Sequence, residues 1–339
     1  MTNATLDRVL AVLVVAAVVS GAVALRAGAP SESWLYVTHG VFAGSLAIAV
    51  IEKLRRSLPR AIAARRLLRL TVSGVVTFIA AGAIAAGITW AASGELVWVG
   101  VAGIGRWTWL TVHAWAGLLL IPVIAVHLVP RRWRLLRPSD RPAARISSGG
   151  IPRRSVLVGA LFLAGGGLVV GVSALAERLQ GATRRFTGSR WLPAGSDPPV
   201  TTFYGEGTAP ADPAEWRLRV TGPGAVRSFD LAELLSLGME ERRVVLDCTS
   251  GWAVEANWRG VPLSSVLSNA GLDQGRRIEV RSVSGWASRL DPGDVGRALL
   301  AVEVNGRRLP PGNGAPCRLV VADRRGLDWV KWVGEIRVA

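Results

Sequence analysis

The sequence predicts an N-terminal all-α membrane bundle of five transmembrane helices, followed by a strand-rich α+β domain. Hydrophobic residues make up 50% of the 339-residue chain, which is a high share for a protein surrounded by water. They concentrate in the first 176 residues, in five apolar stretches that each approach the roughly 20 residues needed to cross a bilayer. The remainder alternates short β-type runs with turns, as a globular domain does.

The five apolar stretches define the predicted spans. They cover residues 8–26, 34–52, 70–91, 107–129 and 156–176. The first stretch lacks a clear small-residue cleavage site and other spans follow it, so we interpret it as a retained helix and not as a signal peptide. The predicted organisation is a membrane domain over 1–176, a polar linker over 177–200 and a globular domain over 201–339.

Positive charge gathers in the loops after the second and the fourth spans. Those loops contain Lys53, Arg55, Arg56, Arg60, Arg65, Arg66 and Arg69, and Arg131, Arg132, Arg134, Arg137, Arg141, Arg145, Arg153 and Arg154. Segments 27–33 and 91–100 contain neither Lys nor Arg. Because cytoplasmic loops carry the positive charge, we expect a multi-pass plasma-membrane protein with a cytoplasmic N-terminus and an extracytoplasmic C-terminal domain. The same rule explains the net charge of +16 without nucleic acid as a partner.

Two readings remain open for Arg153 and Arg154, which precede the fifth span in "GGIPRRSVLVGALFLAGGG". The pair and its mildly apolar, glycine-rich continuation resemble a twin-arginine export signal. Alternatively, they are two further positive-inside arginines. The first reading predicts a C-terminal domain that folds in the cytoplasm around a cofactor before export.

Runs with β propensity follow the linker and are separated by turn residues. They are "EWRLRV", "RVVLDC", "RIEVRSV", "LLAVEVNG", "CRLVVAD" and "EIRVA". Short helices are predicted at "DLAELLSLG" and "PLSSVLSNAG", so that the domain is mixed and rich in strands.

The only three histidines, His39, His113 and His127, all lie in predicted spans, where a ligand-type residue indicates function. His39 and His113 lie at matched depth, roughly 8–9 Å from the outer ends of their helices. Two imidazoles at one depth are what a haem b iron needs, so we predict a haem held by His39 and His113. His127 follows His113 by fourteen residues and is a relic, a propionate or quinone contact, or a second haem ligand with an unidentified partner. The chain offers Glu52 and Lys53 where a partner for His127 is expected. The alternative for all three histidines is hydrogen bonding within the bundle.

Cys248 and Cys317 are the only cysteines, and three roles are open for Cys248. It can form a disulfide with Cys317, since the domain is expected outside the cytoplasm. It can be a buried core residue, because "VVLDC" reads as a strand. It can also ligate a metal, but a lone cysteine excludes structural zinc. A single thiolate does suit molybdenum that is otherwise held by the dithiolene of a pterin.

The residues around Cys248 resemble a known family. Cys248 with Trp252 and Trp258, followed by "GVPL" from Gly260, is similar to the molybdopterin-binding core of the sulfite oxidase family. That family includes sulfite oxidases and periplasmic methionine-sulfoxide reductases. The segments "TTFYGEG" and "GNGAPCRLVVADRRGLDWVKWVGEIRV" resemble its entry segment and its late segment. The resemblance covers residues 200–339 and implies a sulfite oxidase-like α+β fold.

The resemblance also implies roles for single residues. Cys248 would bind molybdenum, and a pair of aromatic residues would line the pterin. Further residues would meet its phosphate or polar edge, with a glycine that allows close approach. These residues are Phe203, Tyr204, Arg318, Arg325, Gly326 and Lys331. Trp332 is either core or cofactor wall, and Cys317 is read as a small buried hydrophobe.

Two departures from the family pattern bear on the substrate. Thr202 stands where asparagine is expected, and segment 282–295 contains no tyrosine, which puts sulfite in doubt as the substrate. Arg289 in that segment would attract an anionic substrate.

Together the modules predict a membrane-bound molybdenum oxidoreductase that catalyses oxygen-atom transfer. Electrons would pass between a small extracytoplasmic substrate and a haem, then to a quinone or another membrane carrier. The alternative is a haem-free, membrane-anchored molybdopterin domain, either sulfoxide-reductase-like or non-catalytic, that a separate partner serves.

Overall fold

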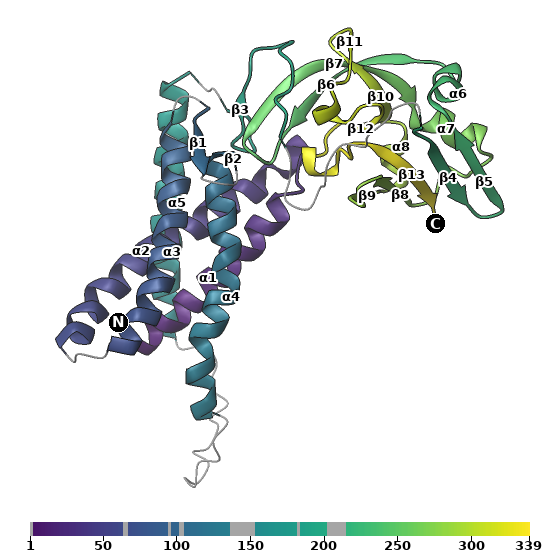
Figure 1. Ribbon diagram of the computed structural model, residues 1–339. Helices are drawn as coiled ribbons and strands as arrows, with labels where there is room; N and C mark the ends of the chain where they lie inside the picture. The colour runs from purple at the N-terminus through teal and green to yellow at the C-terminus, as the bar shows by residue number, and fades with distance from the viewer. Residues whose placement is uncertain are drawn as a thin grey trace. The chain divides into compact units, whose positions relative to one another are not determined.

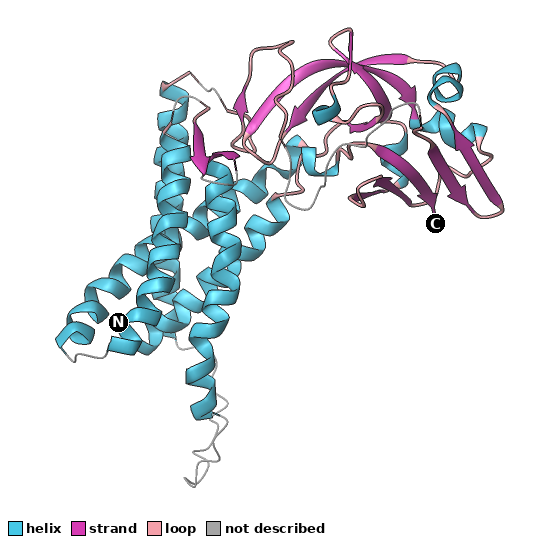
Figure 2. Ribbon diagram, in the orientation of Figure 1, coloured by secondary structure: helices cyan, strands magenta, loops and turns pink. Residues whose placement is uncertain are grey.

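The computed structural model describes residues 3–63, 67–93, 96–101, 105–135, 153–181, 184–201 and 215–339. The chain divides into two compact units. The helical unit comprises Met1–Ala24 and Ser33–Thr183, and the sheet unit comprises Leu25–Glu32 and Arg184–Ala339. Helices dominate the first unit and strands the second (Figures 1 and 2). The short segment between the first two helices therefore belongs with the C-terminal part of the chain.

The helical unit contains five long helices and a small hairpin. The helices are α1 (Asn3–Ala24), α2 (Ser33–Ala63), α3 (Leu67–Ala92), α4 (Trp109–Leu135) and α5 (Arg153–Leu179). The hairpin pairs β1 (Trp98–Val101) with β2 (Gly105–Thr108). In the described part of the chain, all five helices are long and apolar enough to cross a membrane. Large apolar side chains such as Phe78 and Leu161 are 80% and 73% exposed, which suits a lipid environment.

Small residues let α2 and α5 approach closely. A Cβ placed on Gly166 of α5 would lie 2.2 Å from the carbonyl oxygen of Val41. A Cβ on Gly44 of α2 would lie 3.2 Å from Cα of Gly166. Glycines that face each other in this way are typical of helix pairs in membranes, where packing is the main source of association.

The sheet unit contains two sheets. In the six-stranded sheet the order is β11-β10-β7-β3, with β12 paired to β10 and β6 paired to β7. Its strands are β3 (Arg190–Trp191), β6 (Glu240–Asp247), β7 (Trp252–Pro262), β10 (Ala298–Val304), β11 (Arg307–Arg308) and β12 (Arg318–Val321).

The five-stranded sheet has the order β5-β4-β13-β8-β9. Its strands are β4 (Leu218–Gly222), β5 (Ala225–Phe229), β8 (Ile278–Ser282), β9 (Ala287–Leu290) and β13 (Val333–Val338). The short helices are α6 (Leu231–Ser236), α7 (Leu263–Asn269) and α8 (Pro292–Val295), with 3₁₀ turns at η1 (Pro30–Glu32), η2 (Pro311–Asn313) and η3 (Gly326–Asp328). The predicted α+β class is confirmed, and each predicted β run overlaps a strand.

Alternating side chains of the two sheets form the core. Leu218 and Val220 of β4 and Val280 of β8 are fully buried, and they pack with residues of the first sheet such as Leu300 and Leu319. The sequence analysis missed β7 as a strand. Val254, Ala256 and Trp258 are buried while Asn257 and Arg259 are exposed, so the middle of β7 does alternate with the period of a strand. The sequence analysis considered this stretch only as part of the motif around Cys248.

A substitution at Gly260 tests how closely β7 and β10 must pack. A Cβ at this position would lie 2.1 Å from the carbonyl oxygen of Leu300. We expect Gly260→Ala to lower the free energy of unfolding of the sheet unit by about 1–3 kcal/mol, measured by thermal unfolding of the full chain. Gly296→Ala is the control because a Cβ there meets nothing within 4 Å. Equal stability of the two variants would contradict the prediction.

Candidate active site

Cys248 occupies a tight turn between the end of β6 and the start of β7. The Gly251 N–H donates to the Cys248 carbonyl oxygen at 2.9 Å, and the Cys248 N–H donates to the Trp252 carbonyl oxygen at 2.8 Å. Gly251 has a φ of 95°, which favours glycine over any residue with a side chain. The Ser250 N–H and the Thr201 Oγ1 each lie 3.4 Å from Cys248 Sγ. Turn and neighbours thus fix the sulfur in one place.

The thiol faces a cavity that brings together four of the predicted site residues: Cys248, Arg318, Gly326 and Lys331. The described lining residues are Pro199, Thr201, Leu246, Cys248, Thr249, Ser250, Trp252, Trp286, Asn313, Arg318, Gly326, Leu327 and Lys331. They include two cationic side chains and no carboxylate. This charge distribution favours an anionic ligand.

Arg318 and Lys331 are buried although they carry charge. Arg318 is 4% exposed and Lys331 is 5% exposed. Arg318 donates to the Asn313 carbonyl oxygen at 3.0 Å and lies over the ring of Trp258, 5.6 Å from its centre. The Lys331 ammonium donates to the carbonyl oxygen of Thr201. Two buried cationic side chains at one cavity suit a phosphate-bearing ligand.

The structure does not place Arg325 among the lining residues. Its guanidinium donates to the Cys248 carbonyl oxygen at 3.1 Å and lies 3.4 Å from the Asp247 carboxylate. The side chain is 2% exposed. Arg325 therefore supports the Cys248 turn from behind, because the buried Asp247 carboxylate attracts it away from the cavity.

Arg289 is also not brought to the cavity. Its side chain is 85% exposed and pairs with Glu279 at 3.2 Å. Along β9, Ser288 and Leu290 point inward and Arg289 points outward, since side chains alternate along a strand. Phe203 and Tyr204 lie outside the described residues, and so does the side chain of His127.

Cys317 plays no part in the cavity. It is fully buried in the core, and both cysteines are free, which excludes the disulfide alternative. Burial raises the pKa of the Cys317 thiol well above its ordinary value, as expected for a small buried hydrophobe. Trp332, 2% exposed, is a buried residue whose indole N–H donates to the Pro311 carbonyl oxygen at 2.7 Å.

The helical unit contains a separate pair of candidate ligands. The rings of His39 on α2 and His113 on α4 have centres 6.0 Å apart and planes at 71°. His39 Nδ1 lies 3.0 Å from the Ala17 carbonyl oxygen, and His113 Nδ1 lies 2.8 Å from that of Ala83. Because a carbonyl only accepts, each Nδ1 carries a proton, and in the neutral ring each Nε2 then keeps a lone pair. Ligand histidines are oriented in this way in metal sites.

Two glycines make room for these imidazoles. A Cβ on Gly21 of α1 would lie 2.9 Å from the His39 ring, and a Cβ on Gly87 of α3 would lie 2.9 Å from the His113 ring. The matched depth that the sequence predicts therefore corresponds to real proximity. In the described part of the chain, no group of three or more His, Cys, Asp or Glu could hold a bare metal ion.

Comparison with known proteins identifies the C-terminal part. Residues 206–339 match the model of the oxidoreductase molybdopterin-binding domain. The sheet unit therefore carries a molybdopterin-binding oxidoreductase domain, as the motif around Cys248 predicted. The matched range includes strands β4 to β13, most of the residues that line the cavity and both cysteines, and it leaves the helical unit unassigned.

Similar curated proteins are catalytic subunits named protein-methionine-sulfoxide reductase MsrP. The protein of Xanthomonas campestris pv. campestris is 33% identical over 40% of this chain and 51% of its own length. That of Gluconobacter oxydans is 31% identical over 40% and 54%, and that of Ralstonia nicotianae is 28% identical over 61% and 74%. The chain thus spans about half the length of the first of these relatives.

A solved structure, the sulfane dehydrogenase SoxCD from Paracoccus pantotrophus, matches at 20% identity with a TM-score of 0.36, over 48% of this chain and 52% of the other.

The cavity of this molybdopterin-binding domain fits its cofactor. The indole N–H of Trp252 is buried and has no hydrogen-bond acceptor among the described residues, so it is available to a ligand. A Cβ on Gly326 would lie 3.3 Å from Cys248 Cα and 3.2 Å from the Asp247 carbonyl oxygen, so glycine keeps this wall close to the turn. A thiol, an indole N–H and two buried cations match a metal dithiolene with a phosphate. The sequence analysis quoted Trp252 only as part of a motif and missed its free donor.

The Trp252 donor gives a testable prediction. We expect Trp252→Phe to weaken retention of the molybdenum cofactor about tenfold, because one hydrogen bond of about 1–1.5 kcal/mol is lost. Retention is measured as molybdenum per chain after dialysis. Trp191→Phe is the control, since Trp191 is 42% exposed on β3. Identical molybdenum loss in both variants would refute a role for this N–H.

Proposed function

We propose that the chain is a membrane-bound molybdenum oxidoreductase in which Cys248 is the protein ligand to a pterin-bound molybdenum. The observation that carries this proposal is the Cys248 thiol held at a cavity with two buried cations and no carboxylate among its described lining residues. The cofactor supplies oxygen-atom transfer coupled to two electrons. The chain supplies the thiolate, and Ser250 N–H and Thr201 Oγ1, each 3.4 Å from the sulfur, orient it.

The other lining residues bind and orient. Arg318 and Lys331 would neutralise the cofactor phosphate, and Trp252 would donate its free indole N–H. The relatives' names favour reduction of a sulfoxide over oxidation of sulfite. The proposed reaction converts a small extracytoplasmic sulfoxide, two protons and two electrons into a thioether and water. The described lining residues also include Thr249, Ser250 and Trp286, which suit a neutral polar substrate.

We further propose that His39 and His113 hold a haem b that relays these electrons. Two imidazoles bound to one metal ion through bonds of about 2 Å place their ring centres about 6 Å apart. The observed separation is 6.0 Å, and the Nδ1 hydrogen bonds leave both Nε2 atoms as donors of a lone pair. A haem exchanges single electrons, so it can connect two-electron chemistry to a quinone or another membrane carrier.

The arrangement of the first loop supports the proposed topology. Orientation by positive charge requires segment 27–33 and the C-terminal domain on the same, extracytoplasmic side. Leu25–Glu32 is part of the sheet unit, as that orientation demands. The alternative function is a haem-free anchored molybdopterin domain, catalytic or not, with a separate electron partner. It predicts the same molybdenum content but no haem spectrum.

Metal analysis tests the first proposal. We expect about one molybdenum or tungsten atom per purified full-length chain, and we expect Cys248→Ser to lose it together with sulfoxide reduction. Cys317→Ala is the control, because Cys317 lies in the core and both thiols are free. Absence of both metals from the assembled wild-type protein would refute the proposal. Retention of activity in Cys248→Ser would favour a non-catalytic or thiol-independent module.

Absorption spectra test the haem. We expect haem b bands in purified membranes that contain the protein, and we expect His39→Ala and His113→Ala each to abolish them, because one axial ligand is lost. Tyr36→Phe is the matched control, since this residue lies about one turn from His39 on α2 and its hydroxyl donates to the Ala24 carbonyl oxygen. Bands that survive both histidine substitutions would place any haem elsewhere.

A further inference from the structure

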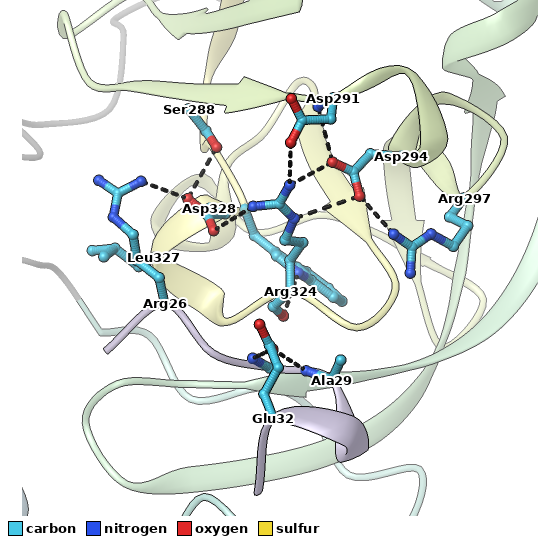
Figure 3. A network of polar contacts seen from close by, with 12 residues as sticks. Arg26, Ala29, Glu32, Ser288, Asp291, Asp294, Arg297, Arg324, Leu327 and Asp328 are labelled. Atoms are coloured by element: carbon cyan, nitrogen blue, oxygen red, sulfur yellow. Dashed lines mark hydrogen bonds and ion pairs between the residues drawn. The ribbon is translucent and has the colours of Figure 1, made fainter. Parts of the chain in front are cut away.

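The connection between α1 and α2 is built into the sheet unit. We call Leu25–Glu32 the strap. Ala27 forms an antiparallel β-bridge with Arg324, and Arg26 lies 3.6 Å from the carboxylate of Asp328. The Gly28 and Ala29 N–H groups both donate to the Glu32 carboxylate, at 2.8 and 2.9 Å, which closes the turn at the end of the strap (Figure 3).

Gly28 is the closest point of this contact. A Cβ at Gly28 would lie 2.8 Å from three backbone atoms: Arg324 C, Arg325 N and the Asp323 carbonyl oxygen. Backbone atoms cannot rotate away as the end of a side chain can, so only glycine allows the strap to lie this close. The strap therefore contacts the backbone of Asp323, Arg324 and Arg325, which directly precede Gly326 in the cavity wall.

The side chain of Arg324, whose backbone contacts the strap, takes part in a network of ion pairs. The Arg324 guanidinium lies 2.5 Å from the Asp294 carboxylate and 3.7 Å from that of Asp328. Ser288 donates to Asp328 at 3.1 Å, and Arg297 lies 2.6 Å from Asp294. Figure 3 shows these side chains converging around Arg324. The loop is thus clamped between the network and the strap.

Arg185 links the strap to the metal ligand. Its guanidinium donates to the Gly28 carbonyl oxygen at 3.1 Å and to the Asp247 carboxylate at 2.5 Å. Asp247 is fully buried and also accepts from Thr187 at 2.8 Å and Ser189 at 2.7 Å. The next residue in the chain is Cys248. A single guanidinium therefore bridges the strap and the residue that carries the Cys248 turn.

A second route runs through the backbone. Arg325 forms a parallel β-bridge with Asp247 and donates to the Cys248 carbonyl oxygen at 3.1 Å. Since Gly28 abuts the Arg325 nitrogen, displacement of the strap would release Arg325 and Arg185 together. Both routes end at the same turn.

We propose that the strap is a positioning element of the molybdenum site, with Gly28 and Arg185 as its positioning residues. It fixes Asp247, and through it Cys248, so that the geometry of the metal ligand depends on the connection between the first two helices. This inference rests on the proposed function for its purpose, but the mechanical link from strap to thiol can be measured without any metal.

The test uses the full chain, prepared without molybdenum cofactor, and measures the rate at which a maleimide reagent labels Cys248. Cys317, fully buried, is the internal reference. We expect Gly28→Ala and Arg185→Gln each to accelerate labelling about tenfold, through easier local opening of the turn. The double variant should label faster than either single variant. Its acceleration should stay below the product of the two single accelerations, because both substitutions act through one contact.

Matched controls separate this effect from general damage. Gly293→Ala adds a Cβ that meets nothing within 4 Å, and Arg243→Gln removes an exposed arginine that pairs with Glu255. Both controls should label within about twofold of the wild type. Arg185→Lys keeps the charge but cannot bridge two acceptors with a planar fork, so it should resemble Arg185→Gln.

The cofactor-loaded protein supplies an independent reading. The electron paramagnetic resonance spectrum of its one-electron-reduced molybdenum should shift in Gly28→Ala and Arg185→Gln and stay unchanged in both controls. Unchanged labelling in the strap variants, or equal acceleration in the controls, would overturn the inference. If the wild type binds no molybdenum, the proposed function fails while the labelling result still decides whether the strap holds the turn.

Discussion

A buried carboxylate organises the site. Asp247 is fully inaccessible to solvent, and an ionised group in that position is tolerated only when its oxygens are satisfied. Arg185, Thr187, Ser189 and Arg325 all direct polar groups at it. These residues come from two sequence-distant segments, so satisfying Asp247 draws both segments against the strand that ends at Cys248. Any change that removes one partner leaves a costly buried charge, and the turn that presents the thiol is therefore more strongly determined than the hairpin hydrogen bonds alone would make it.

Buried charge also shapes the cavity, but there the charge is positive. Arg318 and Lys331 are buried cations that contact carbonyl oxygens and indole rings. Dipoles and ring faces stabilise a cation partly, and an anionic ligand stabilises it further. A positive site that an anionic ligand neutralises would couple binding of that ligand to stability. Negative and positive charge also have separate places in the site: the Asp247 carboxylate holds the turn, and the two cations at the cavity would hold the proposed anionic ligand.

The features that were predicted correctly from the sequence are those that local sequence patterns determine. Matched depth from the outer helix ends anticipated the proximity of His39 and His113, because helix geometry converts residue number into distance. The motif around Cys248 anticipated the cavity with Arg318, Gly326 and Lys331. Arg289, expected to attract an anionic substrate, points away from the cavity on β9, because the face that a strand residue occupies depends on register and a shift of one residue reverses it. Three partners of Asp247, namely Arg185, Thr187 and Ser189, lie within a segment that composition marked as a linker. The contact of Gly28 with the Arg324 backbone joins positions that no periodic pattern relates, and only the folded chain reveals it.

The strap changes how the two modules are connected. When a domain follows the last helix and is joined to it by a single link, residues before that helix do not contribute to the domain's site. Here Leu25–Glu32 belongs to the sheet unit, so the chain enters that unit between α1 and α2 and again after α5. Because the strap contacts the backbone of Arg324 and is linked to Asp247 through Arg185, the sheet unit includes a segment that precedes the rest of it by about 150 residues. If the domain is exported in a folded state, the strap has to be added afterwards, and the last contacts that fix the thiol would form only where the first two helices are already in place.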